Sequence, residues 1–329
     1  MTFAGYAVIL SNLGSSSDRF VPTGYGDRYT IEQLFERAAQ IPQVGAVELV
    51  GTWHVTEGNV RQLKDCLDRT GLKLASIIPD HFGQPKWKKG SFASKEASIR
   101  AEAISHTKEM ADVAVELGCD LLSLWPGQDG YDYLFQSDYV QERQWFVEGI
   151  REASQHRSDV RYSLEYKIKE PRTHGLLSTA ANALLIAQQA GGDNVGVTID
   201  FGHSLNAYET PAEAAALLQQ YGGKLFHVHM NDNYRHWDDD MIVGSVHTIE
   251  TLEFFYWLRR LGYQGWLSID QYPYREDGLA AVREGVLAME AFNRLLDSIP
   301  SGELEGIIAR GEATESTVYL RNLLLRPIT

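Results

Sequence analysis

A carboxylate and an ammonium group lie two residues apart in the stretch YSLEYKIKEPR, residues 162–172. Alternate residues of a β-strand point to the same face, so Glu165 and Lys167 are expected to face one cavity. Pro171 cannot continue a strand ladder, and we therefore predict that this strand ends close to Lys167. The cavity at its end would be lined by charges of both signs.

Three later apolar runs also finish on groups that can bind a metal. These groups are Asp200, His229 and Asp270, and Glu165 makes a fourth. An unpaired charge at the end of an apolar run is costly, so any one of them alone is best explained as a capping or ion-paired group. Four of them at the ends of consecutive strands predict a site for a divalent cation such as Mn²⁺, Mg²⁺ or Co²⁺.

A second group of polar residues lies beside the first. His203 follows Asp200 by three residues in IDFGH, and three aspartates stand together at residues 238–240. Alone, such a run is best explained as a solvated acidic loop. With His203, however, Asp238 and Asp240 can form a second cation site that shares Asp200. Metal ions paired about 3.5–4 Å apart are a known catalytic arrangement.

The elements that must position these groups are eight short apolar runs, each followed by a helical pattern. Their lengths and their Gly, Pro and Asp boundaries indicate strands. Eight strand–helix alternations predict an α/β protein built as a single (β/α)₈ barrel, whose functional groups lie at the C-terminal strand ends. An open doubly wound sheet is the alternative, but it usually carries a G-x-G-x-x-G turn, which is absent here. The predicted strands are residues 6–12, 46–51, 74–79, 121–126, 162–167, 195–200, 224–231 and 265–270.

Two helix starts and the last segment of the chain can also be predicted. Thr30 with Gln33 has the spacing of a capping box, and so does Thr210 with Glu213. The barrel is predicted over residues 1–300, followed by a helical extension over 301–329 that is rich in apolar residues. This extension could fold back on its own chain, but we favour packing against another subunit, which would give a homodimer or homotetramer.

Composition limits the partners of the protein. The 329 residues carry a formal net charge of -14, which disfavours nucleic acid because phosphate binding needs a basic surface. No apolar run reaches the ~18 residues of a membrane span, and no secretory signal is evident. Cys66 and Cys119 are expected to be small buried residues without a disulfide. We therefore expect a cytoplasmic protein that acts on a small molecule.

The motifs resemble those of the xylose isomerase-like sugar isomerases, which include xylose (glucose) isomerases and the Pseudomonas-type rhamnose isomerases. The matching stretches are EYKIKEPR, IDFGH, GKLFHVHMN, DDDMIVG and LSIDQYPYR, and they cover about residues 40–290. The resemblance implies an aldose–ketose isomerase that uses two divalent cations per subunit. Such an enzyme moves a hydride between C1 and C2 of an open-chain monosaccharide.

The resemblance also implies roles for individual residues. The structural metal would be held by Glu165, Asp200, His229 and Asp270, and the catalytic metal by Asp200, His203, Asp238 and Asp240. Lys167 would bind the carbonyl oxygen of the substrate, although a salt bridge to Glu170 or Asp200 is its structural alternative. The other substrate contacts would come from Glu165, His203, His54, Phe82 and Trp125, of which the last two would form an apolar wall.

The chain departs from the family pattern at two places. Xylose isomerases carry a carboxylate where this chain has His229, and there the rhamnose-type enzymes are more similar. Val50 stands where a ring-opening histidine is expected, so His81, as a catalytic residue, and His54 are the nearby substitutes. His227 shares a strand face with His229 and is expected to support the ligands from one layer deeper.

Other activities are compatible with the same scaffold. A ketose 3-epimerase would use one metal and a pair of acid/base carboxylates, and a lyase that cleaves C-glycosides would need a large pocket. A barrel that only binds a sugar or a partner would bind metal without turnover. A related barrel endonuclease is disfavoured by the net charge of -14.

Overall fold

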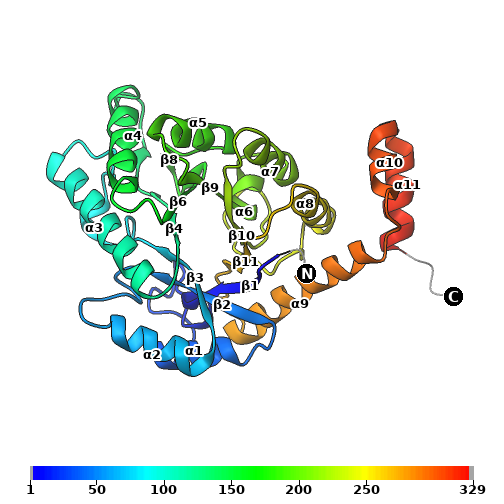
Figure 1. Cartoon of the computed structure of the whole chain (residues 1–329), viewed down its shortest axis with the longest axis horizontal. Coiled ribbons are helices and arrows are strands. Elements are labelled where there is room, and N and C mark those ends of the chain that lie inside the picture. Colours follow the sequence, from blue (N-terminus) through cyan, green and yellow to red (C-terminus); the bar gives the residue numbers. More distant parts are fainter. Residues whose placement is uncertain (1–2, 326–329) are drawn as a thin grey trace. The chain divides into compact units, whose positions relative to one another are not determined.

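The computed structural model describes residues 3–325 and contains a closed barrel of eight parallel strands surrounded by helices (Figure 1). Around the barrel the strands follow the order β1-β11-β10-β9-β6-β4-β3-β2. The predicted (β/α)₈ architecture is confirmed, and each of the eight predicted runs overlaps one barrel strand. The strands are β1 Gly5–Ile9, β2 Val44–Val50, β3 Lys73–Ile78, β4 Leu121–Leu124, β6 Arg161–Glu165, β9 Val195–Asp200, β10 Leu225–Met230 and β11 Trp266–Ile269.

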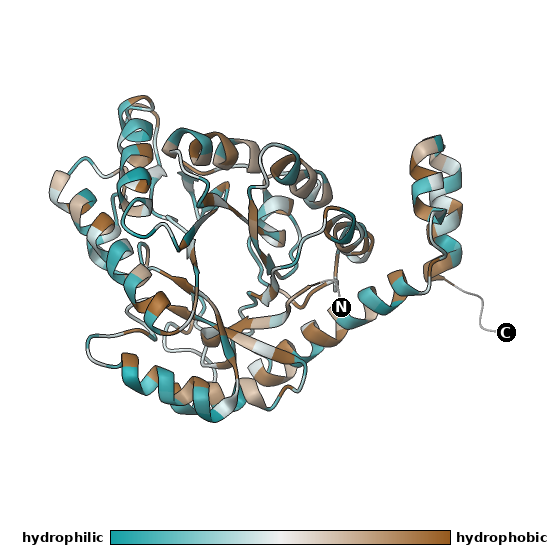
Figure 2. Ribbon diagram, viewed as in Figure 1, coloured by the Kyte–Doolittle hydropathy of each residue, from teal (hydrophilic) through white to brown (hydrophobic). Residues whose placement is uncertain are grey.

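Helices connect the strands and cover the outside of the barrel. Each of the covering helices carries both hydrophobic and hydrophilic residues, as a helix packed on one side must (Figure 2). In the described part of the chain, no helix is long and apolar enough to cross a membrane. The helices are η1 Leu10–Leu13, α1 Ile31–Ala39, α2 Val60–Thr70, η2 Pro85–Trp87, α3 Ala97–Glu116, α4 Gln141–Ser154, α5 Ala180–Ala190, α6 Phe201–Asn206, α7 Pro211–Gln220, α8 Thr248–Arg260 and α9 Gly278–Asp297.

The two predicted helix starts differ in detail. Thr30 and Gln33 form the complete capping box of α1, each side chain bonding the backbone N–H of the other residue. Thr210 does precede α7, with a proline in the first turn, but its side chain makes no capping hydrogen bond. The second capping box is therefore wrong, although the position of the helix is right.

The interior of the barrel is built in layers. Ala7, Ala46 and Ala75 pack with Trp266 in one cluster, and Ile9, Val50 and Ile78 pack with Phe82 in another. Hydroxyl groups are also buried inside, where they bond to one another. The Oγ1 atom of Thr198 lies 3.0 Å from Oγ of Ser123 and donates to Oγ of Ser163 at 2.7 Å. Cys66 and Cys119 are free and buried, as predicted.

A small antiparallel sheet was not predicted. It consists of β5 Gly130–Tyr131, β7 Lys169–Glu170 and β8 Thr173–Gly175. β6 ends at Glu165, close to the predicted end, but the chain then forms a hairpin around Pro171. The N–H of Lys167 donates to the carbonyl of Leu177 at 2.9 Å, so this hairpin fixes the backbone beside the predicted cavity.

The C-terminal segment is helical, as predicted. It contains α10 Glu303–Arg310 and α11 Ala313–Leu324, which contact each other. The chain divides into one compact unit over Met1–Met289 and a second over Glu290–Thr329, and the boundary between these units falls within α9. The role of the extension at a subunit interface stays a prediction.

Candidate metal centre

The C-terminal ends of β6, β9, β10 and β11 bring four ligand groups together. Each of Glu165, Asp200, His229 and Asp270 offers one ligand atom, and these atoms all lie within 4.8 Å of one another. We call these four residues the primary set. All of them are buried except Asp270, whose side chain is 17% exposed. The strands predicted to converge at this edge do so, and the four groups meet there because parallel strands end at the same side of a barrel.

Local structure holds Asp200 in place. Asp200 ends β9 and is the N-cap of α6, where its Oδ1 accepts a hydrogen bond from the N–H of His203 at 2.8 Å. Its other oxygen accepts a bond from Nδ2 of Asn231 at 2.9 Å, and the same amide group contacts Asp240 at 3.2 Å. Gly202 donates its N–H to Oδ1 of Asn231 at 2.8 Å. The motif IDFGH therefore acts as a strand end and a helix start that fix one carboxylate.

A second group of ligand atoms shares Asp200. Asp200, His203 and Asp238 also lie within 4.8 Å of one another, and we call them the secondary set. Nε2 of His203 is 3.1 Å from Oδ2 of Asp238. Asp240 lines the adjoining cavity but is not part of this set. Asp239 is directed elsewhere and accepts a bond from the N–H of Tyr234 at 2.9 Å.

Lys167 is held by two carboxylates at the edge of the secondary set. Its Nζ lies 2.6 Å from Oδ2 of Asp238, forms a second ion pair with Glu170, and is 5.1 Å from the centre of the Trp125 ring. Burial opposes the charge on this amine, but the neighbouring carboxylates prevail and raise its pKa. Lys167 is therefore a buried cation that faces the cavity, with the salt bridge to Glu170 that we considered as its alternative.

The electrostatics favour a bound cation. Burial, assisted by neighbouring carboxylates, raises the pKa of Asp200 to about 6 and that of Asp270 to about 8. Nδ1 of His229, Nδ1 of His203 and Oδ1 of Asp238 are buried and have no hydrogen-bond partner. Carboxylates crowded so closely repel one another, and a bound cation would relieve this repulsion. The buried nitrogen and oxygen atoms without a hydrogen-bond partner are then available to bind that cation. Oxygen and imidazole donors of this kind suit Mn²⁺, Co²⁺ or Mg²⁺.

A cavity of about 270 Å³ adjoins both sets of ligands. Its lining includes the polar residues Glu165, Lys167 and His203 and three aromatic residues. Among the aromatic residues, the Phe82 ring lies 4.6 Å from Trp125 and 5.7 Å from Trp53, measured between ring centres. A small polar molecule could thus contact the metal ligands while aromatic rings shield it from water.

Two predicted histidines do not line this cavity. His81 is fully buried against Trp87, Phe92 and His106, and its Nε2 lies 3.3 Å from the carbonyl of Ala103. Burial lowers its pKa to about 3, so it stays neutral. The prediction of a catalytic His81 is corrected, because the loop after β3 turns its ring toward α3 and away from the barrel axis.

His54 is likewise placed outside the cavity. Its Nδ1 accepts a hydrogen bond from the N–H of Val50 at 2.9 Å, and the ring is 6% exposed. Burial lowers its pKa to about 4. The predicted substrate contact by His54 is corrected, since this ring closes a turn, whereas Trp53 beside it does reach the cavity.

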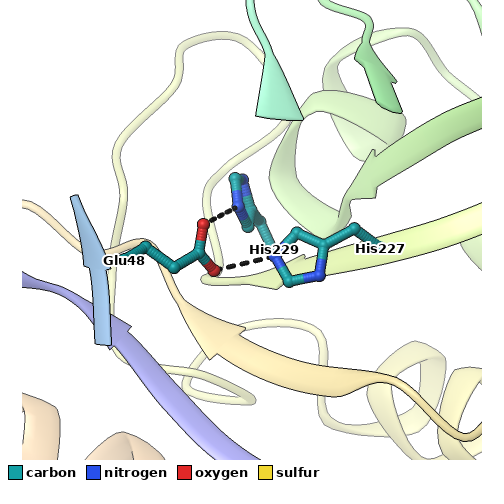
Figure 3. Close-up of side chains that lie close together, drawn as sticks. All are labelled: Glu48, His227 and His229. Atoms are coloured by element: carbon teal, nitrogen blue, oxygen red, sulfur yellow. Dashed lines mark hydrogen bonds and ion pairs between the residues drawn. The ribbon is translucent and has the colours of Figure 1, made fainter. Parts of the chain in front are cut away.

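Sequence reasoning missed Glu48 and Asn231. Glu48 lies in the middle of β2 and contacts His227 and His229 from the other side of the barrel interior (Figure 3). Burial opposes its ionisation, but the two imidazoles hold its pKa well below the usual range. A charged residue in the middle of the apolar run AVELVG was the available signal. Asn231, directly after β10 in HVHMN, gave no comparable signal.

Comparison with known proteins agrees with this architecture. A family model described as xylose isomerase-like TIM barrel matches residues 30–292. A xylose isomerase of Thermus thermophilus is 28% identical over 237 residues, which cover 69% of this chain and 61% of that protein. A xylose isomerase of Thermus caldophilus matches to the same extent. The chain therefore spans less than two thirds of the length of these relatives.

Solved structures show the same fold at lower identity. A D-tagatose 3-epimerase-like protein superposes with a TM-score of 0.67 at 21% identity, and the match covers 89% of this chain and 99% of the chain of that protein. The D-psicose 3-epimerase of Clostridium cellulolyticum H10, solved with D-tagatose, gives 0.68 at 16% identity and covers 88% and 98%. At this identity the likeness is one of fold.

Proposed function

Because the chain belongs to the xylose isomerase-like TIM barrel family, we propose that it is a metal-dependent aldose–ketose isomerase that acts on a monosaccharide. The observation that carries this proposal is the pairing of the primary set with an adjoining secondary set. Beside both lies a cavity that is lined by Lys167 and by aromatic rings.

The ligands divide between two cations. Glu165, Asp200, His229 and Asp270 would hold the first, and Asp200, His203 and Asp238 would hold the second. Asp240 lines the same cavity and is available as a further ligand or as an acid/base group. When bound, such cations would act as Lewis acids on two neighbouring sugar oxygens and orient them.

The side chains of the protein supply the remaining requirements. Isomerisation moves one hydride from C2 to C1 and one proton from the C2 hydroxyl to the C1 oxygen, so atoms and charge balance. Lys167 would stabilise the negative charge that develops on the carbonyl oxygen. Asp240 would accept and return the hydroxyl proton. Phe82 and Trp125 would exclude water from the carbons between which the hydride moves.

A ketose 3-epimerase is the second candidate. Glu165 ends β6 and Asp270 directly follows β11. Both line the cavity, and each offers an oxygen to the primary set. Two carboxylates placed in this way could remove and return a proton at one carbon with a single metal bound. The secondary set and Lys167 have no evident use in that reaction, and we therefore rank it second.

One experiment distinguishes the two candidates. The chain is freed of metal with a chelator, reloaded with Mn²⁺, Co²⁺ or Mg²⁺, and incubated with pentoses, hexoses and 6-deoxyhexoses in D₂O. A hydride shift leaves the product largely free of solvent deuterium, whereas epimerisation introduces deuterium at C3. Absence of turnover for every sugar with metal bound would refute both enzymatic proposals.

A further inference from the structure

A fully buried acid links two histidines beneath the primary set. Glu48 comes from β2 and His227 and His229 come from β10, and these strands lie on different sides of the barrel interior (Figure 3). Nε2 of His227 is 2.7 Å from Oε1 of Glu48, and Nε2 of His229 is 3.3 Å from Oε2. All three side chains are at most 1% exposed, so water does not compete for these bonds.

The orientation of His229 follows from this contact. With Nε2 directed at Glu48, its Nδ1 points the other way, 3.3 Å from Glu165 and 3.5 Å from Asp270. Carboxylate oxygens thus lie within 3.5 Å of both ring nitrogens, and each can only accept a hydrogen bond. A cation bound among the primary set would take the lone pair of Nδ1, so the proton of a neutral imidazole would then lie on Nε2. Glu48 is the acceptor placed to hold the proton there.

Glu48 itself is prevented from turning. His227 occupies one of its oxygens, and Oγ of Ser76 donates a short hydrogen bond to the other. The rings of His227 and His229 pack edge to face, with centres 4.9 Å apart and planes at 84°. Glu48 does not line the cavity, so it has no path to a substrate.

We propose that Glu48 is a positioning residue that acts through His229, fixing its tautomer and orientation so that Nδ1 is the ligand atom of the primary set. A carboxylate behind a ligating histidine also increases the basicity of the ring. The inference rests on the proposed metal centre but not on the proposed sugar chemistry. A purely structural Glu48 would affect stability without changing the affinity for metal or the position of the imidazole proton.

The first test measures metal affinity without turnover. Wild-type chain, Glu48→Gln and Asp129→Asn are stripped of metal, and Mn²⁺ is titrated against a competing chelator. Glu48→Gln keeps the shape but removes the charge, and we expect about 10–100-fold weaker binding, as for other residues behind metal ligands. Asp129 is the matched control, because it is an equally buried acid that bonds Ser91 and Ala93 instead. Its amide variant should bind Mn²⁺ within about twofold of wild type.

The second test does not depend on the folding of a Glu48 variant. Wild-type chain labelled with ¹⁵N-histidine is loaded with Zn²⁺, and two-bond ¹H–¹⁵N correlations locate the proton on each ring. His229 is assigned from the signals missing in His229→Gln. We expect its proton on Nε2 and none on Nδ1. A proton on Nδ1 would overturn the proposal.

The outcomes separate this inference from the proposed function. Mn²⁺ affinity unchanged in Glu48→Gln, in a chain that isomerises a sugar, refutes the role of Glu48 and leaves the enzyme. Weakened affinity with the expected tautomer, in a chain that turns over no sugar, supports Glu48 and refutes the isomerase. A wild-type chain that binds no divalent cation refutes both.

Discussion

The ion pair between Lys167 and Asp238 makes the sharpest prediction about the site. Nζ and Oδ2 are 2.6 Å apart, and the two side chains are 9% and 12% exposed. We consider Lys167→Met, Asp238→Asn and the double variant, all in metal-free chain. Met keeps an unbranched apolar side chain but removes the ammonium group, which also lies over the Trp125 ring, so the principal change is the loss of charge.

The magnitude follows from distance and burial. At 2.6 Å and an effective dielectric constant of about 20, two unit charges attract by roughly 6 kcal/mol, of which desolvation cancels a large part. Removing one partner of a buried pair typically costs about 3–5 kcal/mol. Lys167→Met should cost about 3 kcal/mol of unfolding free energy, because it leaves several carboxylates without their cation.

Asp238→Asn should cost less, about 1 kcal/mol, since it also relieves repulsion with Asp200 and Asp240. The double variant should lie between the two single variants. The coupling energy of the pair is therefore expected to be about 2 kcal/mol.

Urea unfolding in the presence of chelator measures these free energies, and turnover with Mn²⁺ measures the catalytic role. Lys167→Met should lower turnover by about 10²–10³-fold, as expected when a donor to a developing oxyanion is lost. The double variant should regain stability but not turnover. Lys86 and Glu102 provide the control, because they are 2.5 Å apart but 34% and 46% exposed. Their coupling should stay below about 1 kcal/mol.

Two results would refute this reasoning. A coupling energy for Lys167 and Asp238 no larger than that of the exposed control pair would show that the buried pair is not energetically linked. Full turnover of Lys167→Met would show that the amine has no part in the reaction.

Three further predictions follow from the same structure. His81→Phe should leave turnover within about twofold of wild type, since the ring lies outside the cavity. Because burial lowers the pKa of His81 to about 3, the unfolding free energy of the wild type should fall as pH drops below about 6.5, by up to about 3 kcal/mol near pH 4. The variant should lose less unfolding free energy across the same pH range. Gly202→Ala would place a Cβ 2.4 Å from Oδ1 of Asn231, so it should lower the unfolding free energy by about 1–3 kcal/mol and weaken Mn²⁺ binding. Gly26 is the control, because a Cβ there has no atom within 4 Å, and Gly26→Ala should change neither quantity in the same urea and titration assays. Asp129→Asn should lower the unfolding free energy by about 1–3 kcal/mol with turnover unchanged, and an equal loss of turnover would mean that its loop belongs to the site.

The sequence determined the barrel and the primary set. Strands and helices follow from local periodicity and from Gly, Pro and capping residues, which act over a few neighbours in the chain. Parallel strands of a barrel must end at one edge, so Glu165, Asp200, His229 and Asp270 could be placed together without knowledge of their distances. The same rule places His203 and Asp238 beside them, because each lies shortly after one of these strands.

Which of the nearby residues face the site depends on how the whole chain packs. His54 and His81 lie in loops, where the backbone follows no fixed period. The His54 ring closes a turn with Val50, and the His81 ring packs against Phe92 and His106. Glu48 and His227 are separated by most of the chain, and their contact exists only because β2 and β10 face each other in the closed barrel. Local patterns specify a residue's element and its face, but a contact across the interior depends on how all eight strands close.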